Sequence, residues 1–131
     1  MPLRIIVADG EDKVRSALRL LIEQERSLEI IGEAAEATAL LAGVEAHHPD
    51  IVLVDWALPG IEAREMVRLL HLLHSDLTII VLSGRPEMLQ AALDSGADTF
   101  VSKGDPPDHL LTALRAIYSS GSCHATGSAT S

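Results

Sequence analysis

Four short segments of the chain are apolar almost without a break. They are residues 5–8 (IIVA), 51–54 (IVLV), 79–82 (IIVL) and the shorter 100–101 (FV). Short runs rich in β-branched residues are typical of parallel strands that helices cover on both faces. A fifth segment, residues 28–34 (LEIIGEA), is interrupted by charged residues and glycine, so it is predicted to be a less buried edge strand.

The intervals between these runs carry apolar residues three and four positions apart, which indicates amphipathic helices. The clearest stripes are Val14, Ala17, Leu18, Leu21 and Ile22; Met66, Leu69, Leu70 and Leu73; and Leu110, Leu111, Leu114, Ile117 and Tyr118. Residues 36–47 and 88–95 are predicted as the two remaining helices, with Gly96 ending the second. For the last helix, Asp105 is predicted as N-cap and Pro106 as the first helical residue. Five strand–helix units in a row predict an α/β fold, a doubly wound parallel sheet.

The length of 131 residues fits one domain, predicted to span residues 1–118. Residues 119–131 (SSGSCHATGSATS) are small and polar without periodicity, which predicts a disordered tail or the start of a linker. No apolar run approaches 18 residues and the N-terminus lacks a signal-peptide pattern, so we expect a cytoplasmic protein without membrane contact.

Composition excludes several classes of function. Nineteen acidic against ten basic residues give a net charge of -9, the wrong sign for a protein that binds nucleic acid by itself. One cysteine excludes an internal disulfide and a multi-cysteine metal site. Among six histidines, His71 and His74 have a spacing that permits a surface metal contact, although solvated side chains are the commoner outcome.

Chemically active residues follow the predicted strands. In an open parallel sheet, ligands bind outside the carboxyl ends of the strands. The residues at those ends are Asp9, Asp55, Ser83 and Lys103. Each alone has an ordinary explanation, as a helix cap, a turn hydroxyl or a solvated lysine. Because all four fall on one edge of the sheet, together they favour a functional site.

Four segments around these residues resemble the response-regulator receiver family, the CheY-like domains of two-component signalling. They are VADGED, IVLVDWALPG, VLSG and GADTFVSKGD. The resemblance runs from about Leu3 to Tyr118, and the opening LRIIVADGEDKVRSALRLLIE leans towards the NarL/FixJ-like subgroup. It implies the flavodoxin/CheY-like (βα)5 fold with strand order 2-1-3-4-5.

The resemblance also implies a chemistry. Asp55 would accept a phosphoryl group from a histidine of a sensor kinase. Mg²⁺ would be held by Asp9, Asp55 and the backbone carbonyl of Ala57, with Glu11 as a further candidate.

Other residues would contact the phosphoryl group and transmit its presence. Ser83 and Lys103 would bind its oxygens, and Ser83 and Phe100 would form the switch that signals to an output partner, often a transcriptional regulator. Such a module is a signalling domain and not an enzyme. For Phe100, plain core packing is the alternative.

The same resemblance implies a homodimer through the face of the fourth helix, fifth strand and fifth helix. The candidate contact residues are Met88, Leu89, Phe100, Leu111 and Tyr118. We expect no direct contact with nucleic acid, because Arg115 is the only lysine or arginine after Lys103.

One position departs from the family pattern. Gly10 stands where a second carboxylate usually follows Asp9, so Mg²⁺ is expected to bind weakly. This leaves an alternative, a degenerate receiver that acts only by protein–protein contacts. A flavodoxin-type phosphate binder is disfavoured by the acidic first loop, and a haloacid-dehalogenase-type hydrolase by Ala57, where a second Asp is needed.

Overall fold

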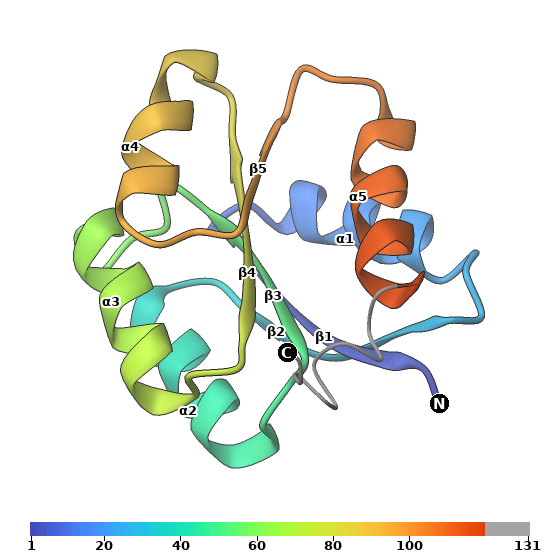
Figure 1. The fold of residues 1–131 in the computed structure, drawn as a ribbon, viewed down its shortest axis with the longest axis horizontal. Coiled ribbons are helices and arrows are strands. Elements are labelled where there is room, and N and C mark those ends of the chain that lie inside the picture. The colour runs from blue at the N-terminus through green and yellow to red at the C-terminus, as the bar shows by residue number, and fades with distance from the viewer. Residues whose placement is uncertain (120–131) are drawn as a thin grey trace.

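The computed structural model describes residues 1–119 as five parallel strands with helices on both faces (Figure 1). The strands are β1 (Leu3–Ala8), β2 (Leu28–Ala34), β3 (Ile51–Asp55), β4 (Thr78–Ser83) and β5 (Thr99–Ser102). The helices are α1 (Asp12–Ile22), α2 (Ala37–His47), α3 (Ala63–Leu73), the single 3-10 turn η1 (Pro86–Met88), α4 (Leu89–Asp94) and α5 (Pro107–Ser119). The sheet order β2-β1-β3-β4-β5 confirms the predicted fold and strand order.

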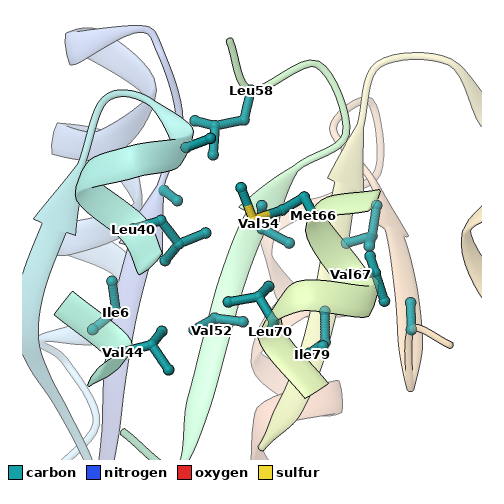
Figure 2. Packing of buried hydrophobic residues seen from close by; sticks show 14 of the residues in the cluster. Ile6, Leu40, Val44, Val52, Val54, Leu58, Met66, Val67, Leu70 and Ile79 are labelled. Carbon is teal, nitrogen blue, oxygen red and sulfur yellow. The ribbon is translucent and has the colours of Figure 1, made fainter. Parts of the chain in front are cut away.

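The strands are buried on both faces, which explains their uninterrupted apolar runs. Ile6 and Val52 belong to one hydrophobic cluster, on the side of α2 and α3 (Figure 2). Ile5 and Leu53 belong to a second cluster, which includes residues of α1 and α5. Side chains alternate between the two faces of a strand, so each central strand contributes to both clusters. The edge strand β2 keeps its two glutamates exposed, as predicted.

The start of α5 differs from the prediction. The helix begins at Pro107, and Asp105 lies before it, with its N–H donating to the Ser102 carbonyl at 3.0 Å. Asp105 is therefore not the N-cap. The physical reason is that a residue followed by proline is disfavoured in helical conformation, so Pro106 cannot begin a helix ahead of Pro107. Gly96 does follow α4 with a positive φ of 115°, as predicted.

The apolar stripe of α1 is less covered than its spacing suggests. Of the predicted stripe only Ile22 is fully buried, Ala17 is exposed, and the other three residues are half-buried. A groove of about 570 Å³ separates α1 from the start of α5, with Leu82 and Val101 among the residues that line it. The late start of α5 leaves this groove open towards Lys103.

The end of α5 can be compared with the predicted end of the domain. Helix α5 continues through Ser119, one residue past the predicted end of the domain at 118. The rest of the predicted tail, residues 120–131, lies outside the described residues. Within residues 1–119 no helix is long and apolar enough to cross a membrane.

Candidate functional site

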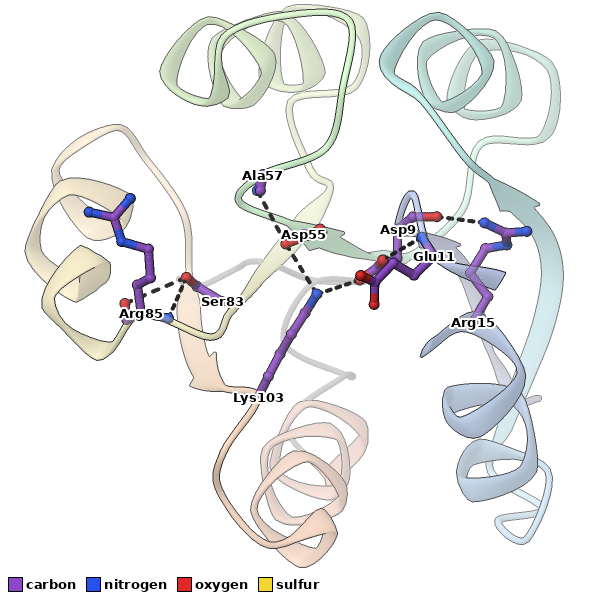
Figure 3. A network of polar contacts seen from close by, with 8 residues as sticks. All are labelled: Asp9, Glu11, Arg15, Asp55, Ala57, Ser83, Arg85 and Lys103. Atoms are coloured by element: carbon purple, nitrogen blue, oxygen red, sulfur yellow. Dashed lines mark hydrogen bonds and ion pairs between the residues drawn. The ribbon is translucent and has the colours of Figure 1, made fainter. Parts of the chain in front are cut away.

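The carboxyl ends of four strands bring polar side chains to one edge of the sheet (Figure 3). Asp9 directly follows β1, Asp55 ends β3, Ser83 ends β4 and Lys103 directly follows β5. The Lys103 N–H donates to the Ser83 carbonyl at 2.8 Å, which extends the pairing of β4 and β5 to the site. Parallel pairing thus assembles the four residues from positions up to 94 apart in the chain.

Lys103 joins the two carboxylates. Its Nζ lies 2.6 Å from Oδ2 of Asp9 and 3.3 Å from Oδ1 of Asp55. The Asp9 side chain is fully buried, and that of Asp55 is 12% exposed. Burial by itself lowers the pKa of Lys103, but the hydrogen bond to Asp9 and the charges of Asp55 and Asp9 outweigh it, so the pKa is raised above its ordinary value. Lys103 therefore stays cationic and neutralises one of the two acids.

The raised pKa sets the pH range of this ion pair. A group whose pKa is higher in the folded than in the unfolded state stabilises the fold fully below its unfolded pKa, here about 10.5, and loses that effect as pH rises through the folded value. We expect the difference in unfolding free energy between wild type and Lys103→Met to stay constant from about pH 7 to about pH 9 and to shrink above the ordinary lysine pKa. Denaturant melts across this range measure it. A difference that fades by pH 9 contradicts the assignment.

Ser83 lies at this edge of the sheet but, within the described residues, makes no contact with the charges of the site. The Ser83 hydroxyl accepts from the Arg85 N–H at 3.0 Å and donates weakly to the Arg85 carbonyl at 3.5 Å. Within residues 1–119 it makes no hydrogen bond to Asp55 or Lys103. Phe100 is half-buried and packs against the hydrophobic cluster on the α2 and α3 side. The structure thus leaves the Ser83 hydroxyl turned to the following loop.

The loop after β1 carries the departure from the family pattern. The Glu11 N–H donates to Asp9 Oδ1 at 2.9 Å, and no hydrogen bond or ion pair of the Glu11 carboxylate is found in the described part of the chain. Asp12 is instead paired with Arg15 at 2.9 Å. A Cβ built on Gly10 would lie 3.3 Å from Cδ of Pro59. Of the acids in this loop, Asp9 is paired with Lys103 and Asp12 with Arg15, whereas the Glu11 carboxylate has no ion pair within residues 1–119.

The residues at this site can hold a divalent cation, with few protein ligands. Mg²⁺ is commonly held by one or two carboxylates, with waters completing its coordination. Asp9 and Asp55 supply two carboxylates close enough to share one ammonium, and Ala57 supplies a backbone carbonyl in the next loop. No cluster of three or more histidine, cysteine or acidic side chains suited to a metal occurs in residues 1–119. The donor set therefore matches Mg²⁺ with few protein ligands.

The histidines have other roles. His71 Nε2 lies 2.9 Å from the Gly96 carbonyl, which ties α3 to the end of α4. The ring of His74 meets that of His48 edge to face, with centroids 6.1 Å apart. Both histidines therefore have contacts within the fold.

Sequence reasoning missed Arg15. Its Nη1 donates to the backbone carbonyl of Asp9 at 2.7 Å, so it touches the loop that carries the site (Figure 3). The signal was an arginine one helical turn after Asp12, a spacing at which an acid and a base meet on a helix.

Comparison with known proteins identifies the family. The family model described as "Response regulator receiver domain" matches residues 5–115. The chain is a response-regulator receiver domain. This confirms the resemblance to the receiver family seen in the sequence.

Individual relatives of this receiver domain are distant but cover most of it. The chain is 27% identical over 119 residues to the response regulator UvrY of Escherichia coli (strain K12), and 34% identical over 120 residues to the response regulator MprA of Mycobacterium sp. (strain KMS). These matches cover 89% of this chain but only 55% and 51% of the relatives. The chain therefore spans about half the length of the curated relatives it matches.

Solved structures agree with the fold. The isolated receiver domain of RcsB from Salmonella enterica serovar Typhimurium, in the presence of the phosphomimetic BeF3-, has a TM-score of 0.83 at 26% identity, with 89% of this chain and 88% of that one covered. A LuxR-family two-component response regulator from Aurantimonas sp. SI85-9A1 has a TM-score of 0.84 at 28% identity, covering 91% and 86% of the two chains. The relatives are response regulators of two-component signalling.

Proposed function

We propose that Asp55 is the phosphoacceptor of this receiver domain and that Lys103 and Ser83 bind the phosphoryl group. The observation that carries the proposal is the contact of Lys103 with both Asp55 and the buried Asp9. A carboxylate can attack a phosphoryl group only if the negative charge of the incoming group is neutralised. Lys103 supplies a fixed cation beside Asp55.

The reaction is a phosphoryl transfer from a phosphorylated histidine of a sensor kinase. A carboxylate oxygen of Asp55 attacks phosphorus, the new O–P bond forms, and the P–N bond to the imidazole breaks. The electron pair stays on the imidazole nitrogen, which takes a proton. Lys103 pairs with one phosphoryl oxygen. The Ser83 hydroxyl leaves the Arg85 backbone to donate to another, and Phe100 moves inward with it.

Asp9, Asp55 and the carbonyl of Ala57 are the residues that would hold Mg²⁺, with Glu11 as a further candidate. The ion supplies neutralisation of charge on the transferring group. Gly10 brings no carboxylate, so we propose that binding is weak. Only Gly10 favours the alternative of a degenerate receiver, because Asp55, Ser83 and Lys103 are all present.

The proposal is tested with a small-molecule phosphodonor and Mg²⁺. Intact-mass analysis is expected to find one added phosphoryl group on wild type and none on Asp55→Asn, because the amide removes the nucleophilic oxygen. Asp50→Asn is the matched control, since Asp50 lies at the opposite end of β3. Continued labelling of Asp55→Asn contradicts the assignment.

We propose that this receiver switches an output partner or domain that often regulates transcription, because its curated relatives are response regulators about twice as long as the matched region. The receiver itself is not expected to contact DNA, because its net charge of -9 has the wrong sign for binding phosphates. A histidine-kinase partner implies a cytoplasmic location. Each chain takes up one phosphoryl group and acts as a switch rather than as an enzyme.

We also propose weak self-association through the face formed by α4, β5 and α5, increased by phosphorylation as the active population rises. Leu89 and Tyr118 are 44% and 43% exposed there. Leu111 is 5% exposed and packs in the core, so its inclusion in this face was wrong.

Light scattering with a phosphoryl mimic is expected to show dimer for wild type and less dimer for Leu89→Glu. Leu20→Glu on α1 serves as control. Unchanged monomer at all concentrations contradicts the proposal.

A further inference from the structure

Arg15 closes the loop after β1 from three sides. Its Nη1 donates to the Asp9 carbonyl at 2.7 Å, and its Nη2 to Oδ1 of Asp12 at 2.9 Å. Its Nε lies 3.4 Å from Oε1 of Glu33, on the neighbouring strand β2. The Arg15 side chain is only 15% exposed, so its contacts with Asp9 and Glu33 are partly shielded from water, whereas Asp12 is 88% exposed. One guanidinium therefore ties together the start of the loop, its end and the sheet edge.

The contacts of Arg15 bridge the most flexible part of the loop after β1. Between Asp9 and Asp12 lie only Gly10 and Glu11, and glycine lets the backbone rotate more freely than any other residue. Rotation of the Asp9–Gly10 peptide would move the Asp9 carbonyl, and the next peptide along the chain carries the Glu11 N–H that donates to Asp9 Oδ1. Arg15 holds that carbonyl directly, and no side chain at position 10 can do so.

We infer that Arg15 is a positioning residue that fixes the Asp9–Gly10 peptide, and so keeps Asp9 and Glu11 placed for the cation. The inference rests on the proposed function of the site. Arg15 does not touch the reacting atoms; it acts through the backbone of Asp9. It also pairs with Asp12, which keeps that carboxylate on the helix surface and leaves Glu11 to face the site.

A lysine at position 15 could not make all three contacts of the arginine. The planar guanidinium offers donors in fixed directions, and here three of its nitrogens meet three different partners. An ammonium is a single point charge that cannot span those partners together. Arg19 offers a matched control, because it lies on the same helix as Arg15 and also pairs with Glu33. Within residues 1–119 it makes no hydrogen bond or ion pair with residues 9–12.

The experiment compares wild type, Arg15→Lys and Arg19→Lys. Mg²⁺ is titrated against the fluorescence of Trp56, which directly follows Asp55. Hydrogen exchange of the Glu11 amide is measured without metal, and thermal unfolding reports stability. Residues that orient metal ligands typically change metal affinity about 10- to 100-fold. Arg15→Lys is expected to weaken Mg²⁺ binding about tenfold and to speed Glu11 exchange, while Arg19→Lys leaves both unchanged.

A double-mutant cycle with Gly10→Ala separates positioning from general stability. Alanine restricts the backbone at position 10, so Arg15→Lys is expected to cost less Mg²⁺ affinity in that background. Unchanged Mg²⁺ affinity and unchanged Glu11 exchange in Arg15→Lys overturn the inference, even if the protein melts earlier. If wild type gives no Mg²⁺ response at all, the proposed function fails, and the exchange of Glu11 still decides whether Arg15 holds the loop.

Discussion

Replacement of Lys103 by methionine is expected to slow phosphorylation of Asp55 about a hundredfold and to lower the free energy of unfolding by about 2 kcal/mol at neutral pH. Methionine keeps the apolar stem but removes the charge that faces Asp9 and Asp55. The fully buried Asp9 would lose its only cationic partner in residues 1–119, and two carboxylates would repel each other. Intact-mass time courses measure the first effect and denaturant melts the second.

The chain offers a matched control, because Lys13 is the only other lysine and lies exposed on α1. Lys13→Met is expected to change neither quantity. Adding Asp55→Asn to Lys103→Met is expected to return part of the lost stability by removing the repulsion between the acids. If Lys103→Met phosphorylates at the wild-type rate, Lys103 does not bind the phosphoryl group.

Gly10→Asp is expected to tighten Mg²⁺ binding about tenfold or more. A full negative charge about 4 Å from a cation contributes several kcal/mol at the effective dielectric of a protein surface, and desolvation offsets part of this. The backbone φ of Gly10 lies outside the left-handed region, so aspartate is sterically admissible. Its Cβ would approach Pro59 Cδ to 3.3 Å, so the proline must shift slightly. Trp56 fluorescence reports the Mg²⁺ titration.

Two further variants test which side chain supplies the negative charge that binds Mg²⁺. Gly10→Asn adds nearly the same volume without a charge and is expected to bind Mg²⁺ no more tightly than wild type. Glu11→Gln tests whether the neighbouring acid compensates for Gly10. If Gly10→Asp and wild type bind equally while Glu11→Gln loses the ion, Glu11 already supplies the second carboxylate and the site is not weak.

The strands were predictable because burial on both faces demands unbroken apolar runs. Residues 28–34 match β2 to the residue, since its glutamates and glycine mark an edge. The start of α5 was not predictable from Asp105 and Pro106 alone, because a second proline shifts the first turn by one residue. The exposure of α1 was not predictable either, because helical spacing shows which face is apolar but not how closely a partner helix covers it.

The residues of the site were predictable from the same strand pattern as the fold. Asp9, Asp55, Ser83 and Lys103 were identified because parallel strands end at one edge. The ion pairs of Lys103 with both acids depend on side-chain rotamers, which periodicity does not encode. The role of Arg15 was missed because its hydrogen bond to the backbone carbonyl of Asp9 leaves no mark in the side-chain pattern of the motif.

The central claim is that Asp55 forms the acyl phosphate. Borohydride reduces an acyl phosphate to an alcohol, so treating the phosphorylated protein with it marks the acceptor permanently. Peptide fragmentation then locates the mark. We expect it at Asp55 alone, within the segment that also contains Trp56. A mark on Asp9, Asp12 or any other acid, with Asp55 unmodified, would contradict the account.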